Sequence, residues 1–408
     1  MADRYWVGGT ANWDGTALLK WSTTSGGLGG ASVPTTADDV FFTSLSTGTC
    51  TIAAGNTGAK SINCTGFTGT IAGSAAITVA GGVTLVSAMT YTHSGTMTFT
   101  GTGTLTTAGK NFSAITVDGV GITVTLGDAL NTTWAFILTQ GTFNANIYSV
   151  TALRFSSDNS NTRNLTMGSG LWTLSGAGLS TGTAPWNTSA TSNLTFNKGT
   201  ADILLSNNGG GQRAFFGGAL FYNKLTIGGT SSGGICRFQD PSSFTEIAST
   251  KTVAHTITLV SNLGTIDTWS VTGSAGNVVT VNSNTAGTRR TFNLTNVTSG
   301  IDYLSVKDIA VNQANRFYVG VNSTDGGNNL NVIFTAPPSG YTITAVNGTY
   351  LVSGQTATLS FGRLLSAQNG VYSVAGQAVD ISVGAPPAPT LGIELFVEIR
   401  SFTERRRF

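Results

Sequence analysis

Charged side chains are scarce in this chain of 408 residues. Lysine, arginine, aspartate and glutamate together make up 9% of it, and the formal net charge is +2. A disordered chain combines few hydrophobic residues with high net charge, whereas this one is 40% hydrophobic and almost neutral. So small a net charge also gives no electrostatic reason to bind nucleic acid or an anionic membrane. The composition therefore predicts a folded protein with no nucleic-acid partner.

Long apolar runs are also missing. No uninterrupted stretch approaches the roughly 18 apolar residues that a transmembrane helix needs, so we expect no membrane insertion. The first six residues include Asp3 and Arg4 and lack the apolar centre of a secretory signal. We therefore expect a protein that is made in a cytoplasm without a signal peptide.

Cysteine is limited to Cys50, Cys64 and Cys236. Their spacing matches no metal-binding motif, and cysteine is among the residue types that are most often buried. The main expectation is therefore three small buried side chains. A disulfide between Cys50 and Cys64, or a metal site, is the alternative.

What the chain does contain is a long series of short alternating runs between about Thr49 and Thr295. Met97–Thr100, Ile122–Leu126 and Leu225–Ile227 each alternate a large apolar residue with threonine. Such alternation places the apolar residues on a buried face of a strand and the threonines on the opposite face. The runs return roughly every ten residues, and the residues between them favour turns. This pattern predicts an all-β protein.

The repeats predict a parallel β-helix, in which each coil covers the exposed edge of the previous coil. Segment 112–119 recurs as 222–229 with its hydrophobic and glycine positions kept. A β-sandwich would need far fewer strands, and a propeller would show a longer period with a fixed signature. Coils of roughly 20–28 residues would give about ten turns and a rod of about 50 Å. The residues expected to share its core are Ile115, Val117, Leu194, Phe196, Leu225 and Ile227.

Residues 1–48 differ from this body, because they hold three of the seven tryptophans: Trp6, Trp13 and Trp21. The order Gly-Gly, Asn-Trp, Trp-Ser, Val-Pro-Thr and Asp-Asp-Val-Phe across residues 8–41 resembles the opening of bacterial autotransporter passengers and related phage surface proteins with right-handed parallel β-helices. The resemblance implies that residues 1–48 form an N-terminal cap, which shields the unpaired backbone of the first coil. The aromatic cluster could instead be a platform on which sugars stack.

Residues 49–336 are expected to form the β-helix. Their segments 110–117 and 194–200 resemble repeats in tailed-phage structural proteins, and residues 316–334 resemble the closing coil of those proteins. Residues 341–384 then carry a repeat of 22 residues, in which 347–355 recur as 369–377. Two copies predict a small β module of about four strands that leans on another body. Residues 385–408 are expected to be a proline-rich linker and an anchoring strand.

Acidic residues are too few and too scattered to indicate an active site. Residues 1–390 contain one glutamate and fourteen aspartates, of which only Asp38 and Asp39 are adjacent. Glycoside hydrolysis ordinarily needs two carboxylates at a set separation, whereas neighbouring strand residues point apart. The pair is therefore expected to mark a turn and the start of a strand. The aspartates that could still converge from neighbouring coils are Asp158, Asp202, Asp240 and Asp267.

Other reactive groups have structural explanations too. His93 and His255 lie within strand-like sequence and are expected to be packed or surface side chains rather than catalytic bases. Arg289–Arg290 and Lys307–Asp308 are expected at solvated corners. Asp325–Asn329 could hold calcium, but it lacks the regular spacing of a calcium loop, so a tight turn is expected. No nucleophile triad, phosphate loop or metal-ligand spacing is present, so we expect no catalytic residue, metal or cofactor.

The tail, Leu391–Phe408, carries the most specific prediction. Its apolar residues alternate along a strand that follows the proline spacer, and such an edge aggregates unless it pairs with a partner. Addition to a sheet of another subunit or virion protein would bury the apolar face, and the terminal arginines would meet an acidic surface. The residues expected to bind the partner are Ile393, Leu395, Phe396, Val397, Ile399, Phe402, Arg405, Arg406 and Arg407. The alternative is that the tail folds back on its own chain.

The resemblance to tailed-phage proteins implies a function that fits these observations. We expect a non-enzymatic structural protein on the virion surface, as a head decoration, a tail fibre or a spike. Its partners would be other virion proteins, further copies of itself and a host-surface glycan. The enzymatic alternative is a tailspike depolymerase that degrades polysaccharide. The other alternative is a bacterial β-helical adhesin, which would need a signal peptide and a membrane barrel.

Overall fold

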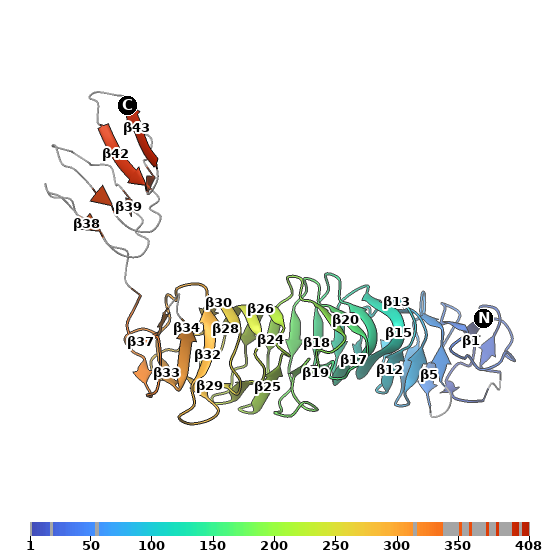
Figure 1. The fold of residues 1–408 in the computed structure, drawn as a ribbon. Helices are drawn as coiled ribbons and strands as arrows, with labels where there is room; N and C mark the ends of the chain where they lie inside the picture. The colour runs from blue at the N-terminus through green and yellow to red at the C-terminus, as the bar shows by residue number, and fades with distance from the viewer. Residues whose placement is uncertain are drawn as a thin grey trace. The chain divides into compact units, whose positions relative to one another are not determined.

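The computed structural model describes residues 2–16, 19–53, 57–312 and 316–337, together with six short strands between 351 and 407. The chain divides into two compact units, Met1–Ala336 and Pro337–Phe408. Every regular element among the described residues is a β-strand, which confirms the all-β prediction. The first unit is a parallel β-helix of about 13 turns, drawn as a long stack of coils in Figure 1.

Strands in successive turns lie side by side, in parallel. On β12 (Thr96–Phe99), for example, Met97 pairs with Ile77 of β9 (Ile77–Val79) on one side and with Ile115 of β15 (Ala114–Leu126) on the other. The wall built in this way has three faces. In the first part of the rod the chain visits them in the same order in every turn.

The first face runs along most of the rod. Its strands are β6 (Gly58–Ala59), β9, β12, the first halves of β15 and β17 (Ala135–Asn144), β19 (Arg154–Ser156), β22 (Trp186–Asn187), β25 (Gln212–Phe216), β27 (Ile235–Phe238), β29 (His255–Leu259), β31 (Val279–Ser283), β33 (Leu304–Lys307) and β36 (Thr324–Asp325).

The second face is shorter. Its strands are β1 (Asp3–Trp6), β4 (Asp39–Phe41), β7 (Ser61–Asn63), β10 (Val83–Thr84), β13 (Gly103–Thr106), the second halves of β15 and β17, β20 (Arg163–Thr166) and β23 (Leu194–Asn197). In the described part of the chain, β23 pairs with β20 and with no strand of the following turn. The second face therefore ends at β23, and later turns pass directly from the first face to the third.

The third face again spans the rod. Its strands are β2 (Ala11–Trp13), β5 (Thr49–Ile52), β8 (Thr70–Gly73) and β11 (Thr90–Tyr91), followed by β14 (Asn111–Phe112), β16 (Leu130–Thr132), β18 (Val150–Ala152), β21 (Trp172–Leu174), β24 (Ile203–Leu205), β26 (Phe221–Ile227), β28 (Ser243–Ser249), β30 (Thr265–Ser270), β32 (Arg290–Leu294) and β34 (Ile309–Asn312). Near the ends of the unit, β3 (Trp21–Ser22) pairs antiparallel with β1, and β35 (Phe317–Tyr318) pairs with β37 (Val332–Ile333).

The alternation in the sequence decides which side chains fill the rod. In β12 the threonines are partly exposed and Met97 and Phe99 are buried, because successive strand residues point to opposite faces. The inward residues of all turns form one continuous core. Of the six residues predicted for this core, only Leu194 and Phe196 are not fully buried, although they pack against it. Both lie on β23, which no later strand covers.

The rod has more turns than the roughly ten expected from coil length. One reason is that coils can be short, since Met97 and its partner Ile115 are only 18 residues apart. The other is that residues 1–48 contribute turns of their own, because β4 pairs in parallel with β1 before it and with β7 after it. Residues 1–48, expected as a cap, thus hold the first strands of the β-helix together with the tryptophan cluster. At ~4.8 Å between neighbouring strands, the rod is on the order of 60 Å long.

The repeated motif in 112–119 and 222–229 does not mark equivalent positions. Ile115 lies on the first face, where it pairs with Phe136 of β17. Leu225, its counterpart in the second copy, lies on the third face and pairs with Ile203 of β24. Alternation specifies a strand with one buried side but not the face on which that strand lies, so similar sequences occupy different faces.

In the second unit, the six described strands pair two by two. β38 (Leu351–Val352) pairs in parallel with β40 (Ser373–Val374), and β39 (Leu359–Ser360) pairs in parallel with β41 (Ile381–Ser382). Leu359 lies opposite Ile381, so the 22-residue repeat of the sequence is also the spacing of the ladder. β42 (Glu394–Ile399) and β43 (Phe402–Arg407) are antiparallel. The predicted proline spacer, 385–389, lies outside the described residues.

Candidate functional site

The tryptophans of residues 1–48 form the N-terminal end of the core. Trp6, Trp13 and Trp21 are fully buried, and the ring of Trp21 meets the other two edge-on at centroid distances of 5.1 and 5.0 Å. Phe42 packs against all three and reaches Phe67 of the next turn, 5.1 Å away. A buried ring cannot stack on a sugar. The sugar-platform alternative is therefore wrong for these residues.

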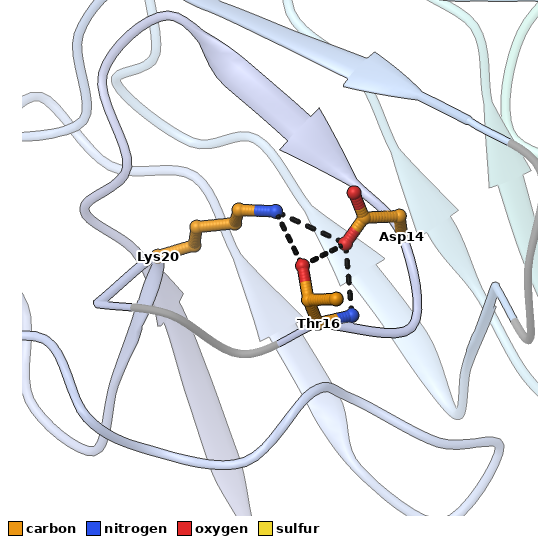
Figure 2. Close-up of polar contacts among 3 residues, drawn as sticks. All are labelled: Asp14, Thr16 and Lys20. Carbon is orange, nitrogen blue, oxygen red and sulfur yellow. Dashed lines mark hydrogen bonds and ion pairs between the residues drawn. The ribbon is translucent and has the colours of Figure 1, made fainter.

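A small polar cluster follows the second of these tryptophans (Figure 2). Asp14 Oδ1 accepts hydrogen bonds from the Thr16 N–H at 2.8 Å, the Thr16 hydroxyl at 2.5 Å and Lys20 Nζ at 3.0 Å. The two bonds from Thr16, and then the bond from Lys20, lower the pKa of Asp14 to about 2. The Thr16 hydroxyl donates to Asp14 and accepts from Lys20 at 3.0 Å. These bonds fix the turn after β2.

The two adjacent aspartates point apart, as predicted. Asp38 accepts hydrogen bonds from the N–H of Thr35 at 3.1 Å and from its hydroxyl at 2.9 Å, which closes the turn before β4. Asp39 begins β4 and bonds to the next turn, to Ser61 at 2.5 Å and to Lys60 at 3.0 Å. The two carboxylates thus bond to different groups, as expected for a turn followed by the start of a strand.

The four aspartates that could have converged lie in different turns instead, and only Asp267 is part of a strand, β30. Each accepts a hydrogen bond from a residue about one turn away: Asp158 from Asn187 (3.0 Å) and Ser189 (2.9 Å), Asp202 from Asn223 (2.6 Å), Asp240 from the Gly218 N–H (3.0 Å) and Asp267 from Thr295 (2.8 Å). These bonds connect neighbouring turns. Among the described residues, no three His, Cys, Asp or Glu side chains are close enough together to hold a metal ion.

The histidines and cysteines are packed inside the rod. His93 Nε2 lies 2.7 Å from the Ala75 carbonyl, and His255 Nδ1 lies 2.8 Å from the Val253 carbonyl. Burial lowers the pKa of both imidazoles. All three cysteines are buried and free, so the expectation of small buried side chains is confirmed and the disulfide alternative is wrong. Burial also raises the pKa of Cys236 to about 11.

Asp325–Asn329 is a turn that is closed by its own amides. Asp325 Oδ1 accepts hydrogen bonds from the Gly327 N–H at 2.8 Å and from Asn329 Nδ2 at 2.6 Å. Asn328 donates in the same way to Asp308 of the preceding turn at 2.6 Å. Calcium requires oxygen ligands that face the ion, whereas these carboxylate oxygens face amide donors. The turn prediction is confirmed.

Buried arginines are a feature that the sequence did not reveal. Arg163 is fully buried, and its guanidinium donates to the carbonyls of Ala190 at 2.8 Å and Ser192 at 2.7 Å and also to that of Ser157. Arg213 is buried in the same way, against the carbonyls of Leu205 and Gly228. A single arginine in an alternating run gives no signal of burial, because the carbonyls that surround it are brought together only by the fold, some of them from another turn.

The residues predicted to bind a partner lie in β42 and β43, except Ile393, which is outside the described residues. The register places Phe396 opposite Arg405 and Ile399 opposite Phe402. Arg405–Arg407, expected to meet an acidic surface on a partner, therefore lie in a strand that pairs with β42 of the same chain. Residues 400 and 401, between the two strands, lie outside the described residues. Partner binding by these strands stays a prediction.

An open apolar hollow, which the sequence also did not reveal, lies where the second face ends. Leu194 and Phe196 of β23, with Leu220 and Phe221 of the following turn, line a depression of about 450 Å³. The Phe221 side chain is 44% exposed, and Lys198 Nζ lies 4.2 Å above its ring. Residues 194–197 read as one more alternating strand, so nothing in them shows that the next turn leaves them uncovered.

Comparison of the chain with protein-family models, with curated proteins and with solved structures gave no match. The likeness to tailed-phage proteins therefore rests on the sequence motifs. The structure supports only the fold that this likeness implies, a parallel β-helix. The described residues contain no helix that is long and apolar enough to cross a membrane.

Proposed function

We propose that this chain is a non-enzymatic structural protein on the exterior of a tailed-phage virion, as a head decoration, a tail fibre or a spike. It joins other virion proteins and further copies of itself through its C-terminal region, and its rod faces a host-surface glycan. The fold supports this proposal, because a parallel β-helix is what the motifs of residues 1–48 imply for phage surface proteins of this kind.

The observation that carries the proposal is the use of carboxylates along the wall. Asp158, Asp240 and Asp302 each accept hydrogen bonds from residues about one turn away. Charge-assisted hydrogen bonds of this kind are among the stronger ones in proteins. Here they connect each turn of the β-helix to a neighbouring turn. A rod that uses its few charges for this purpose is suited to keeping its shape outside a cell.

Two experiments test the proposal: one asks whether the chain is part of the virion, and the other asks whether it degrades host polysaccharide. Immunogold labelling of gradient-purified particles should place the chain at a fixed position on the virion. Purified protein incubated with host capsule or lipopolysaccharide should release no oligosaccharide. Release that a single Asp→Asn substitution abolishes would overturn the proposal in favour of a depolymerase tailspike.

A further inference from the structure

The end of the second face leaves a strand edge open in the middle of the rod. The Asn193 and Asn197 carbonyls accept hydrogen bonds from Arg163 and Met167, both at 2.9 Å, and so point toward β20 and its end. Backbone groups of a strand alternate in direction, so the N–H and carbonyl of Phe196 point the other way. No described strand pairs with them there. An open edge of this kind is a template for another strand.

The hollow beside this edge has the position of the missing strand. Phe196 pairs in register with Leu165, which is fully buried, so its side chain faces the interior although part of it remains exposed. The ring of Phe196 lies 5.1 Å from that of Tyr222 in the following turn. Leu194 forms the floor beside it, and Phe221 forms the rim. An added strand would cover the floor with every second side chain.

One positive charge marks the rim. Lys198 follows β23, its Nζ sits over the Phe221 ring, and it donates to Thr245 at 3.4 Å. It forms no ion pair with any carboxylate among the described residues. A strand that fits this edge therefore carries apolar residues at alternate positions and a carboxylate that lies near Lys198, at the rim of the hollow.

The chain's own tail has this composition. Residues 391–400 alternate Ile393, Leu395, Val397 and Ile399 with other residues, among them Glu394 and Glu398. These two are half of the four glutamates in the whole chain. In its own unit, β43 pairs along one edge of β42, and a strand has two edges. We propose that residues 391–400 of a second copy add as a strand to the open edge of β23, with a glutamate beside Lys198. This inference rests on the proposed function, for which it supplies the contact between copies.

Charge reversal in full-length chains tests the contact. The rim variant is Lys198→Glu, the tail variant is Glu394→Lys with Glu398→Lys, and the matched control is Val120→Lys, at a position that is 85% exposed elsewhere on the rod. Sedimentation velocity over a concentration series gives the association constant of each chain. The rim variant and the tail variant should each have an association constant about tenfold or more below that of the parent. The control should associate like the parent. A mixture of rim and tail variants should associate again, since opposite charges then meet between copies.

A cross-link locates the contact. Chains with Phe221→Cys are mixed with chains with Glu398→Cys and oxidised, and a non-reducing gel should show a mixed dimer. The native cysteines should form no cross-link, because all three are buried. A cross-link that forms only within a chain carrying both substitutions, or equally well from Val120→Cys, overturns the proposal. So does self-association that charge reversal leaves unchanged.

The outcome is separable from that of the proposed function. If Lys198→Glu chains lose self-association but still label virions, the strand contact holds and other contacts attach the rod. If chains associate as expected but label no virion, the contact stands and the virion role is wrong. Circular dichroism and Tm, unchanged from the parent, show that each variant is folded.

Discussion

Arg163 shows at the scale of one residue how this rod buries a charge. Its side chain has no contact with water, and burial lowers the pKa of its guanidinium. Carbonyl oxygens from two loops surround it and accept its hydrogen bonds. Removing one member of such a set leaves the other buried polar groups without partners, which costs more than the set contributes as a whole.

We expect Arg163→Met to lower the free energy of unfolding by about 2–5 kcal/mol, since it keeps the volume but leaves buried carbonyls unpaired. Urea denaturation followed by circular dichroism measures the change. Arg289→Met, at an exposed position, is the control and should change the value by no more than about 0.5 kcal/mol. Equal effects of the two substitutions would show that the hydrogen bonds between Arg163 and the surrounding carbonyls do not stabilise the rod.

Leu225→Ala should cost about 2–5 kcal/mol, because the side chain is fully buried between Ile203 and Ile247 and its loss leaves a cavity. Val120→Ala, at an 85% exposed position, should cost less than about 0.5 kcal/mol. Both values come from the same urea titration. A small effect at Leu225 would mean that the core rearranges to fill the space.

The two histidines should make the rod less stable in mild acid. Each has a folded pKa below its unfolded value of 6.5, so the unfolded chain binds protons first as the pH falls. Their stabilisation is complete above pH 6.5 and declines as the pH falls toward the folded pKa, by at most about 1.4 kcal/mol per pH unit for each. Unfolding titrations at pH 7.5 and 5.5 measure the loss. A His93→Gln, His255→Gln chain should lose less between these two values.

At the scale of elements, the corners where two turns approach are the most demanding positions. Gly168 follows β20 with a φ of +77°, and a Cβ added there would lie 1.7 Å from the Asn146 carbonyl oxygen of the previous turn. Gly109 has a φ of +74° but nothing within 4 Å of such an atom. The two glycines therefore separate the cost of the backbone angle from the cost of a clash.

We expect Gly109→Ala to cost about 1 kcal/mol, from the backbone angle alone. Gly168→Ala should cost clearly more, about 3 kcal/mol or above, because the backbone of a neighbouring turn must also move. Thermal unfolding of the two variants side by side gives the comparison. Equal shifts in Tm would show that the turns are not in close contact at Asn146.

The sequence predicted the elements better than their places. Alternation in Met97–Thr100 is enough to predict a strand with its methionine and phenylalanine buried, and the strand is there. The face on which a strand lies depends on how many residues each loop takes before the chain returns, and alternation does not encode that. Ile115 and Leu225 therefore occupy different faces, and the exposure of Phe196 could not be predicted from residues 194–197.

At the scale of the whole molecule, the chain consists of two compact units. The core of the rod lies within the first unit, and the described strands of the second pair only with one another. The 22-residue spacing of the second unit could be predicted because its two copies are nearly identical in pattern. The hairpin partner of β42 could not, since charged residues such as Arg405–Arg407 are not typical of a strand.

Truncation after Pro389 should leave the rod intact and abolish its assembly. The removed residues make no part of the first unit, so Tm and the circular dichroism spectrum should match the full chain. The shortened chain should fail to join particles or oligomers, because β42 and β43 are absent. Assembly at parental occupancy would show that the tail is not the anchor.

The loss of the second face also has a mechanical consequence. Resistance to bending rises with the distance of material from the bending axis, so a three-walled tube is stiffer than a two-walled slab of the same length. The rod has three walls as far as β23 and two from β25 onward. A sideways force on the rod should therefore bend it more readily from β25 onward, where two walls remain. A strand added to the open edge of β23 would extend the three-walled part of the rod by one strand.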